Sequence, residues 1–505
     1  MGAVNQVQRA AWLAQAERHQ LDLDRPSGPR FWSERLETMS PDELRAVQDT
    51  KLRAAVRFAY ECVPFYRHKL DRAGIDPGDV GSVDDLAHLP VTTRQEMAED
   101  VAAHPPWGTY TSVDDAVWAE RGWQVFATSG TTGLPRVFRY TAFDRVAWSW
   151  IGARAMWAMG FRPGRDSAML AFGYGPHVWL WGVHYALHRM GVPIVTAGGL
   201  DSRTRARFID AYRPTILACT PSYALYLAAV AEELGIDPAT TSVRFLFCAG
   251  EPGISVPSTR ARLEARWGAE LHEFYGCTEA APSAGAHTCA AVARPGPGGE
   301  PGQPPPGAEP GQPGPGAEPG QPPPGAEPGL HLSEDTHLWE VVDPVSHAPV
   351  PDGQRGVSVV TSLHSEASPQ LRFVVGDWAR LVRDRCACGR TSARALGGFA
   401  GRADDLLNVR GVTLFPSAVE DAVRRVAEVG EEFEVVVDRP RDLDVLTVRV
   451  EVRRDVDAGR HPAVARLVES EIVSRCELRP VVEVLPHGVL PRTERKARRV
   501  RDLRE

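Results

Sequence analysis

The sequence predicts an α/β protein with a large N-terminal domain of mixed or parallel sheets, which includes a small β-subdomain, and a small α+β domain at the C-terminus. Three observations lead to this fold class. The chain has 505 residues, more than one hydrophobic core usually supports. Strand-length apolar runs alternate with helical stretches over the first half of the chain, as in sheets covered by helices. Near the C-terminus, helix and strand patterns alternate within a compact unit of about a hundred residues.

The first elements are helical. The segment up to about Leu70 carries apolar residues at three- and four-residue spacing after a helix start at Ser40-Pro41. Five apolar runs further along are predicted to be strands of largely parallel sheets: SAMLAFG, VPIVTAGG, PTILACT, VRFLFCAG and AELHEFYG.

Residues 294–329 interrupt this pattern. A nine-residue repeat begins at Gly307, Gly316 and Gly325, and its glycine and proline content cannot build a core. We expect a flexible, partly polyproline II insertion on the surface. Strand patterns resume at Leu330 and continue to about Val382.

The C-terminal part reads as a separate α+β unit. We expect helices over 415–429 and 461–476, and strands over 431–440, 444–454 and 480–486. The predicted organisation is therefore a large domain over 1–400, a hinge over 401–405 and a small domain over 406–505.

Composition limits the function. With 43% hydrophobic and 24% charged residues the chain is of the globular class, and its formal net charge of −8 argues against a nucleic-acid binder. The N-terminus has no apolar signal core, and no run of about 18 apolar residues occurs. We therefore expect a cytoplasmic protein that does not bind membranes.

One segment, VFATSGTTGLPRVFRY, indicates phosphate binding. Its backbone N–H groups and short side chains can surround phosphate oxygens closely, and Arg136 adds a cation. A solvated Gly/Thr turn is the simpler alternative, but six small or hydroxyl residues in succession favour a ligand. These residues are Thr128, Ser129, Gly130, Thr131, Thr132 and Gly133.

This segment resembles the phosphate-binding loop of the adenylate-forming superfamily, which includes acyl-CoA synthetases, nonribosomal peptide adenylation domains and luciferases. Further segments are similar to its phenylacetate-CoA ligase-like branch: VPFYRHKL, FGYG, ACTPSY, AGEP, YGCTE, RFVVGD and GRADDLLNVRGVTLFP. The resemblance covers nearly the whole chain outside the insertion. It implies ATP-dependent formation of an acyl-adenylate, with release of pyrophosphate, followed by acyl transfer to coenzyme A.

The resemblance also implies roles for individual residues. Tyr275, followed by Gly276, lies against adenine, Thr278 offers a hydroxyl to the α-phosphate, and Glu279 binds Mg²⁺, which prefers carboxylate and phosphate oxygens. Asp377 binds the ribose hydroxyls, although Phe373, Val374 and Val375 replace the Tyr-Arg-Thr that often precedes this Gly-Asp. The loop that passes along the adenine consists of Ala249, Gly250, Glu251 and Pro252.

Other matches lie in the hinge segment and in the small domain. Asp404 corresponds to the hinge on which this mobile domain turns, Arg402 reaches the nucleotide, and Gly411 lines the pantetheine path. Lys496 matches the catalytic lysine, whose ammonium contacts the substrate carboxylate and the α-phosphate. It is one of only three lysines among 57 basic residues. A solvated basic tail is the alternative.

Four residues form a candidate structural zinc site, Cys289, His331, Cys386 and Cys388. Three thiolates and one imidazole suit tetrahedral Zn²⁺, and relatives of the phenylacetate-CoA ligase branch are similar here. The metal would close the base of the insertion. Reduced core cysteines and a surface histidine are the alternative.

An aromatic segment indicates the class of acyl group. The segment FGYGPHVWLWGVHYALHRMG corresponds to the acyl-pocket region of the family and is rich in aromatic rings, which suit a flat apolar acid such as phenylacetate or benzoate. Candidate pocket residues are Tyr174, His177, Trp181 and Tyr223. Core packing is the alternative for such rings. The acceptor could instead be a carrier-protein phosphopantetheine or an amine, the fold could serve as a non-catalytic nucleotide-binding scaffold, and the chain could form a homodimer.

Overall fold

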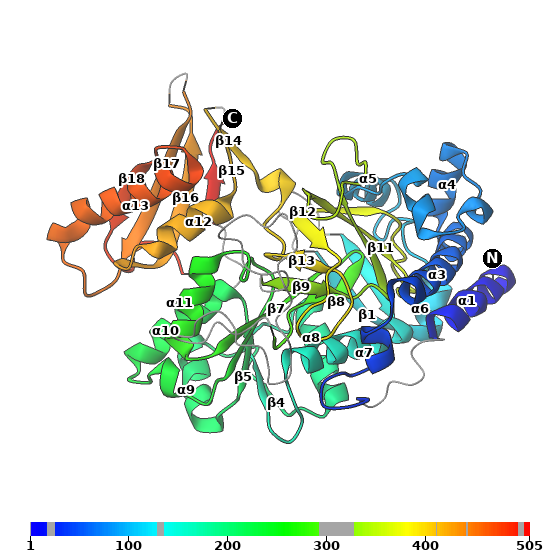
Figure 1. The fold of residues 1–505 in the computed structure, drawn as a ribbon, viewed down its shortest axis with the longest axis horizontal. Coiled ribbons are helices and arrows are strands. Elements are labelled where there is room, and N and C mark those ends of the chain that lie inside the picture. Colours follow the sequence, from blue (N-terminus) through cyan, green and yellow to red (C-terminus); the bar gives the residue numbers. More distant parts are fainter. Residues whose placement is uncertain are drawn as a thin grey trace, which may run out of the picture.

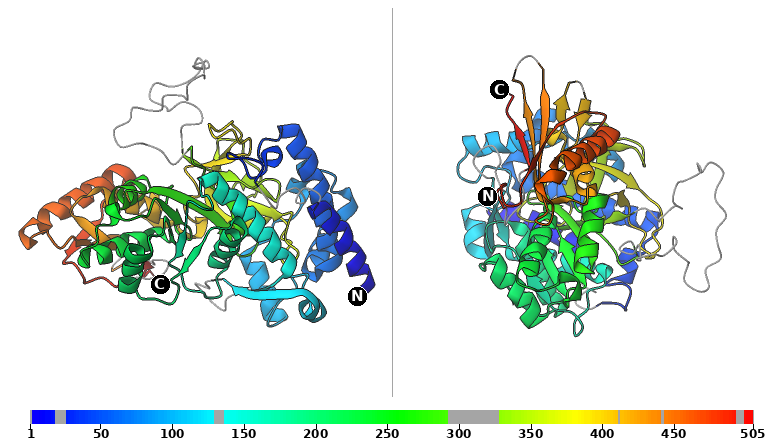
Figure 2. Two further views of the ribbon diagram at one scale, coloured as in Figure 1. Left: turned by 90° about the horizontal axis from the view of Figure 1, so that it is seen from below. Right: turned by 90° about the vertical axis from the view of Figure 1, so that its left-hand side faces the viewer.

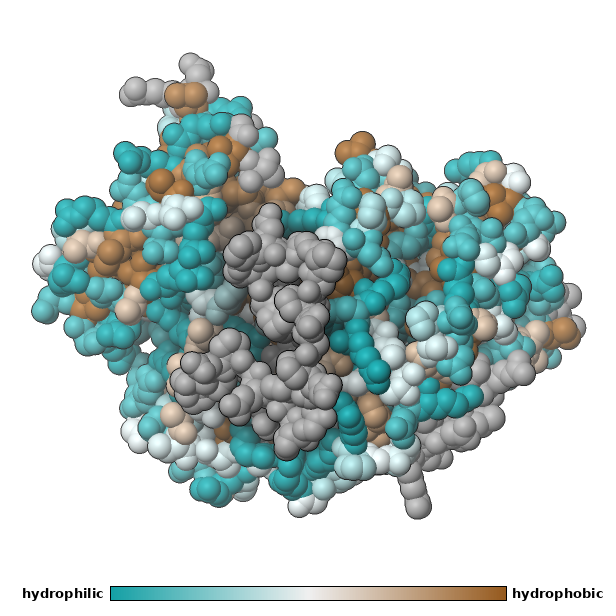
Figure 3. All heavy atoms as spheres, viewed as in Figure 1, coloured by the Kyte–Doolittle hydropathy of each residue, from teal (hydrophilic) through white to brown (hydrophobic). Residues whose placement is uncertain are grey.

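The computed structural model of the chain describes residues 2–17, 26–128, 136–291, 328–410, 412–440, 443–492 and 499–504. A large domain occupies most of the molecule, and a small C-terminal domain lies at one end, opposite the N-terminal helices (Figures 1 and 2). It lies against α10 (Pro221–Glu233) and α11 (Pro257–Trp267). A notch separates the two domains at one edge of the surface (Figure 3). None of the helices in the described ranges has both the length and the apolar character needed to cross a membrane.

The N-terminal part is helical, as predicted. Ser40 begins α3 with a capping box, in which its side chain accepts from the Glu43 N–H and the Glu43 carboxylate accepts from the Ser40 N–H. The helices of this part are α1 (Gly2–Glu17), α2 (Glu34–Glu37), α3 (Pro41–Cys62), α4 (Pro64–Ala73), α5 (Arg94–Ala103) and α6 (Asp115–Arg121).

An eleven-stranded mixed sheet forms the centre, in the order β10-β11-β12-β13-β9-β8-β7-β6-β5-β3-β4. Neighbouring strands from β7 to β4 are parallel, and all five coincide with the predicted apolar runs. They are β3 (Ala168–Leu170), β4 (Ile194–Thr196), β5 (Ile216–Cys219), β6 (Phe245–Cys248) and β7 (Glu270–Cys277).

Helices cover both faces of this parallel half, which explains why its strands are continuously apolar. On β5, Ile216 and Ala218 pack with residues of α7 and α8, whereas Leu217 and Cys219 pack with residues of α9, α10 and α11. The covering helices are α7 (Ala142–Met159), α8 (Val178–Met190), α9 (Ser202–Tyr212), α10 (Pro221–Glu233) and α11 (Pro257–Trp267).

The other half of the sheet is antiparallel. Its strands are β8 (Ala281–His287), β9 (Gly329–Leu332), β10 (His337–Val342), β11 (Arg355–Ser362), β12 (Phe373–Val382) and β13 (Arg394–Leu396). β8 pairs with β9 through Ala286↔Leu332 and His287↔His331, so the two sides of the repeat lie next to each other. Residues 294–327 of the predicted insertion lie outside the described residues, and its last predicted residue, Gly329, instead begins β9. A separate hairpin of β1 (Gly122–Ala127) and β2 (Val137–Thr141) precedes α7.

The small domain begins with the hairpin of β14 (Leu407–Val409) and β15 (Val412–Leu414). A four-stranded sheet follows, with the order β18-β17-β16-β19. Every predicted helix and strand of this domain is present. Three additional strands, β14, β15 and β19, were not indicated by the sequence, and β19 is parallel to β16. The elements are α12 (Pro416–Arg425), β16 (Val429–Asp438), β17 (Val445–Val452), α13 (His461–Cys476), β18 (Val481–Leu485) and β19 (Val500–Asp502).

Polar contacts join the small domain to α11. Asp421 of α12 accepts from the Ser258 N–H at 3.0 Å, and the Arg262 guanidinium donates to the carbonyl oxygens of Val429 and Gly430. The two domains therefore meet through hydrogen bonds rather than through a continuous apolar core.

Candidate functional site

The candidate site lies where parallel strands of the main sheet end. β5, β6 and β7 are neighbours, and their carboxyl ends lead into Thr220, into Ala249–Pro252 and into Thr278–Glu279. Ligands of open α/β sheets bind outside the carboxyl ends of the strands. The topology therefore brings two of the predicted nucleotide-binding segments to one edge.

The base of the predicted phosphate loop lies beside this edge. The last paired residues of β1 and β2 are Ala127 and Val137. Beyond them, the Thr128 N–H donates to the Arg136 carbonyl at 3.0 Å. The Thr128 hydroxyl accepts from the Arg136 N–H at 3.1 Å. Ser129, Gly130, Thr131, Thr132 and Gly133 lie outside the described residues.

Arg136 connects this hairpin to Glu279. Its guanidinium donates to the Glu279 carboxylate at 2.9 Å, and Arg94, at the start of α5, lies 3.7 Å from the same oxygen. Glu279 is buried, with 4% of its surface exposed. A hard carboxylate oxygen suits Mg²⁺, and guanidinium groups bind phosphate oxygens, so this donor set fits a metal-bound phosphate. Arg94 was not predicted, because nothing near it in the sequence resembles a phosphate motif.

Close backbone packing shapes the turn before Glu279. A side chain at Gly276 would place its Cβ 2.3 Å from the Ala281 carbonyl oxygen, which rules out any larger residue without movement of the backbone. Glycine therefore allows β7 and β8 to approach each other immediately before Thr278.

Tyr275 and Asp377, predicted to bind adenine and ribose, are in direct contact. The Tyr275 hydroxyl donates to the Asp377 carboxylate, and its ring stacks on Phe399 with centroids 3.6 Å apart. Phe399 was not predicted to be near the site. Arg402 forms an antiparallel bridge with Asp377, so the start of the hinge segment lies alongside β12.

The loop Ala249–Pro252 is held by two carboxylates. Glu251 accepts from the backbone N–H and the hydroxyl of Ser222 at 3.1 and 2.9 Å. Glu273, which is buried in β7, accepts hydrogen bonds from the N–H groups of Gly253 and Ile254 at 3.1 and 2.6 Å. Burial raises the pKa of Glu273 to about 7. The predicted adenine loop is thus fixed at both ends.

The hinge and the tail are described in part. Asp404 belongs to a 3₁₀ turn over Ala403–Asp405. Gly411 and Lys496 lie outside the described residues. The chain on either side of 493–498 is anchored, because Arg492 pairs with Glu451 at 2.7 Å and Arg499 with Glu432 at 3.2 Å.

The predicted acyl-pocket residues occupy different environments. Tyr174 and Trp181 contact each other edge to face with centroids 5.3 Å apart, and the Pro176 carbonyl accepts from the Ala127 N–H, which brings this segment to the phosphate hairpin. His177 is exposed at the start of α8. Tyr223 is buried, and its hydroxyl is engaged by Arg205 at 2.7 Å and Ser202 at 2.9 Å.

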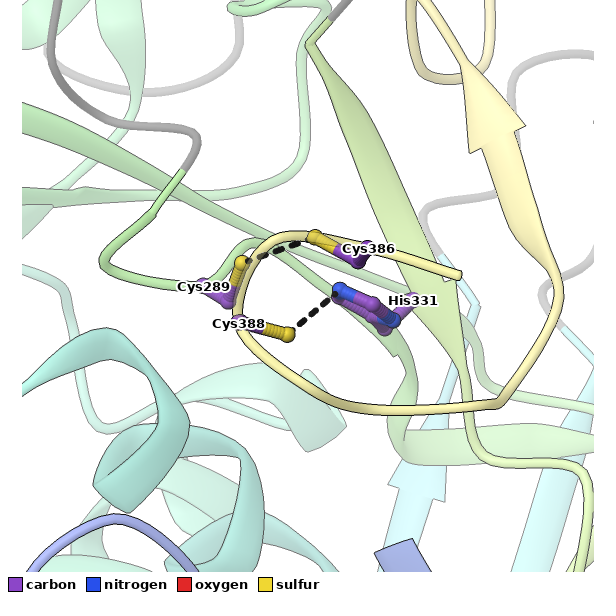
Figure 4. Close-up of side chains that lie close together, drawn as sticks. All are labelled: Cys289, His331, Cys386 and Cys388. Carbon is purple, nitrogen blue, oxygen red and sulfur yellow. Dashed lines mark hydrogen bonds between the residues drawn. The ribbon is translucent and has the colours of Figure 1, made fainter. Parts of the chain in front are cut away.

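The four predicted zinc ligands converge, and their side chains point toward one another (Figure 4). The sulfur atoms of Cys289 and Cys386 are 3.9 Å apart, and the Cys388 sulfur is 3.4 Å from His331 Nε2. Tetrahedral Zn²⁺ with ordinary bond lengths requires S···S and S···N separations of about 3.8 and 3.6 Å. The geometry therefore fits a closed tetrahedral site.

Neighbouring groups orient these ligands. His331 Nδ1 lies 3.1 Å from the Ser392 hydroxyl, which leaves Nε2 facing the cysteines. The Arg390 N–H contacts the Cys388 sulfur at 3.4 Å, and Arg30 donates to the Cys388 carbonyl at 2.8 Å. All four candidate ligands are buried.

The chain is similar to known families and proteins over most of its length. Residues 46–326 match the AMP-binding enzyme family, and residues 411–504 match the AMP-binding enzyme C-terminal domain. The phenylacetate-coenzyme A ligase of Thermus thermophilus is 32% identical over 488 residues, which cover 93% of this chain and 99% of that protein. The same enzyme from Aromatoleum evansii is 32% identical over 476 residues, with coverage of 93% and 97%.

A solved structure is also similar. The chain superposes on 2-hydroxyisobutyryl-CoA ligase, in the postadenylation state with R3-HIB-AMP, with a TM-score of 0.83 and 29% identity, covering 94% of this chain and 93% of that one. The TM-score falls to 0.67, with 30% identity and coverage of 95% and 94%, for the same enzyme in the thioesterification state with 2-HIB-AMP and CoA.

Proposed function

Because the chain belongs to the AMP-binding enzyme family, in its phenylacetate-CoA ligase-like branch, we propose that it activates a small aromatic carboxylic acid with ATP and transfers it to coenzyme A. The coarser activity, that of an ATP-dependent carboxylate–CoA ligase, follows from the curated relatives and the structural neighbour. The observation that supports the proposed site best is the meeting of Thr128, Arg136 and Glu279 beside the paired Tyr275 and Asp377.

The proposed first step is attack of the substrate carboxylate on the α-phosphorus of ATP, which forms an acyl-adenylate and expels pyrophosphate. Mg²⁺ held by Glu279 would neutralise charge on the phosphates. Arg136 and Arg94 supply guanidinium groups beside that carboxylate, and Thr278 offers a hydroxyl to the α-phosphate. Lys496 would stabilise the charge that develops during attack. Positioning and electrostatics therefore account for the rate, without a covalent side-chain intermediate.

The second step requires movement of the small domain about Asp404, so that the coenzyme A thiol can attack the mixed anhydride and release AMP. The higher similarity to the postadenylation form than to the thioesterification form supports the assignment of the described arrangement to the first half-reaction. The hydrogen bonds that join the domains, from Ser258 to Asp421 and from Arg262 to Val429, would break when the small domain rotates.

A panel of carboxylic acids, scored by pyrophosphate release with coenzyme A present, tests the proposal. Phenylacetate- or benzoate-like acids should give the highest kcat/KM and an acyl-CoA product, whereas Lys496→Ala should give no acid-dependent release above background. Preference for short aliphatic hydroxy acids would contradict the aromatic assignment. A product formed only with a carrier protein or an amine would contradict coenzyme A as the acceptor.

We also propose that Cys289, His331, Cys386 and Cys388 hold a structural Zn²⁺, which the fit of the donor distances supports. Purified protein should contain about one zinc per chain by elemental analysis. Cys386→Ser should lower both the zinc content and Tm, because metal binding stabilises only the folded chain. Cys62→Ser, at a buried cysteine outside the cluster, is the matched control. Zinc content near zero in the wild type would exclude the metal.

A further inference from the structure

Two buried hydroxyl groups hold the backbone of Thr278 and Glu279. Tyr140, on β2, donates to the carbonyl oxygen of Thr278 at 2.6 Å. Ser368, in the loop between β11 and β12, donates to the carbonyl oxygen of Glu279 at 2.5 Å. Both side chains are fully buried. Two successive carbonyl groups are therefore each fixed by a side chain from a different part of the chain.

We propose that Tyr140 and Ser368 are positioning residues for adenylation, which hold the Thr278 hydroxyl and the Glu279 carboxylate in the orientation that the metal and the phosphates require. The inference rests on the proposed function, in which the side chains of Thr278 and Glu279 act on ATP. A turn between two strands could otherwise rotate its peptide groups, and a small rotation would redirect both side chains.

The hydrogen-bond direction at Ser368 is fixed by its neighbours. The Gln370 amide nitrogen donates to the Ser368 hydroxyl at 3.0 Å, and the Gln370 amide oxygen accepts from the Tyr66 hydroxyl at 2.8 Å. The Tyr66 oxygen in turn accepts from the Leu371 N–H at 3.0 Å. Because the nitrogen of Gln370 can only donate, the hydrogen of Ser368 is available for the Glu279 carbonyl.

Tyr140 is equally constrained. Its ring packs edge to face against Trp148, with centroids 4.6 Å apart, inside a cluster of aromatic side chains. Burial raises the pKa of Tyr140 well above its usual value, so the hydroxyl remains a donor throughout the neutral range. The ring therefore fixes the position of the oxygen, and protonation fixes its role.

The two positioning residues belong to one rigid unit. Thr141, next to Tyr140, donates to Glu366 at 2.8 Å, and Glu366 lies two residues before Ser368. Asp144 accepts from the N–H groups of Glu366 and Ala367 at 2.9 and 3.2 Å. Arg121 pairs with Glu366 at 2.8 Å, and Arg9 of α1 also donates to it. The end of β2 and the β11–β12 loop therefore hold Thr278–Glu279 as a single support.

The test compares Tyr140→Phe and Ser368→Ala with two matched variants. Tyr60→Phe removes a tyrosine hydroxyl that donates to the Asp71 carboxylate at 2.8 Å, and Ser333→Ala removes a buried serine hydroxyl that donates to the Ala284 carbonyl at 2.6 Å. Acid-dependent ATP–pyrophosphate exchange, its Mg²⁺ dependence and Tm are measured for all four variants and the wild type.

Removal of either positioning hydroxyl should lower kcat by about 10- to 100-fold, the range found when groups that orient a metal ligand are removed. KM for ATP should change little, while the Mg²⁺ concentration for half-maximal rate rises. Both matched variants should keep the wild-type kinetics, and Ser333→Ala should lower Tm because it removes a buried hydrogen bond. If one positioning variant fails to fold, the other decides.

Two results overturn the inference, and they are distinguishable. An active wild type whose positioning variants keep its kcat and Mg²⁺ dependence would mean that the hydroxyls only stabilise the fold. A wild type without acid-dependent exchange would remove the proposed function and, with it, the role assigned to Tyr140 and Ser368.

Discussion

Replacement of Glu279 by glutamine should lower the rate of acid-dependent pyrophosphate exchange by about 100-fold or more. Glutamine keeps the size of the side chain but removes the charge that binds Mg²⁺. The same charge balances Arg136 at 2.9 Å and Arg94 at 3.7 Å. Steady-state exchange at saturating ATP and Mg²⁺ measures the effect, and excess Mg²⁺ should restore little of the loss.

A second glutamate-to-glutamine change separates catalysis from the loss of an ion pair. Glu340, on β10, accepts a hydrogen bond from Arg372 at 3.1 Å and pairs with a second nitrogen of the same guanidinium at 3.0 Å, and neither residue is proposed to contact the nucleotide. Glu340→Gln should lower Tm with less than a threefold change in kcat. Equal activity losses in the two variants would show that Glu279 acts only through its arginine partners in the fold.

The largest effect on stability is expected for Asp335→Asn, which should lower the free energy of unfolding by about 3–5 kcal/mol. Asp335 is buried and accepts two hydrogen bonds from the buried Arg154 at 2.7 and 2.9 Å. Its carbonyl accepts from the ammonium of Lys51 at 2.7 Å. Without the carboxylate, two buried cations remain with no counter-charge between them. Denaturant unfolding measures the loss.

Two further variants, Arg154→Met alone and Arg154→Met combined with Asp335→Asn, test this electrostatic cause. Arg154→Met combined with Asp335→Asn removes the unpaired guanidinium, so the double variant should be more stable than Asp335→Asn alone. If the double variant loses the sum of the stabilities lost in the two single variants, the unpaired guanidinium is not the cause of the loss in Asp335→Asn.

Lys51 supplies a pH-dependent check. Burial lowers its pKa from the ordinary 10.5 to about 8. The native state therefore binds fewer protons than the unfolded state between these values, and the contribution of Lys51 to stability becomes more favourable as pH rises from about 8 to 10.5. The unfolding free energy of the wild type minus that of Lys51→Met should therefore increase as pH rises across this window. A difference that does not vary with pH would contradict the buried charge.

The sequence was sufficient for most of the fold. Continuous apolar runs predicted β3 to β7 because helices cover both faces of these strands, and the Ser40-Pro41 signal placed the start of α3. The four candidate zinc ligands meet in space, as expected from the sequence, although Cys289 and Cys388 are 99 positions apart. Features that require particular residue types at particular positions, such as a helix start or a set of metal ligands, can be recognised in the sequence.

The remaining features depend on contacts between distant segments. β19 consists of Val500, Arg501 and Asp502, which have no strand periodicity and pair only because β16 presents a free edge. Arg94, Phe399, Tyr140 and Ser368 each reach the site from a different element, so no short motif contains them. Supporting residues of this kind are specified by the tertiary structure alone.

The antiparallel register of β8 and β9 has an evolutionary consequence. Ala286 faces Leu332 and His287 faces His331, so the pairing is defined by residues on both sides of the glycine- and proline-rich repeat and not by its length. Doubling the length of a loop costs only about 0.6 kcal/mol in the entropy of loop closure. Because a nine-residue unit is encoded by whole codons, replication slippage can add or delete one without a frameshift. We expect natural alleles that differ in repeat number to keep the same strand register.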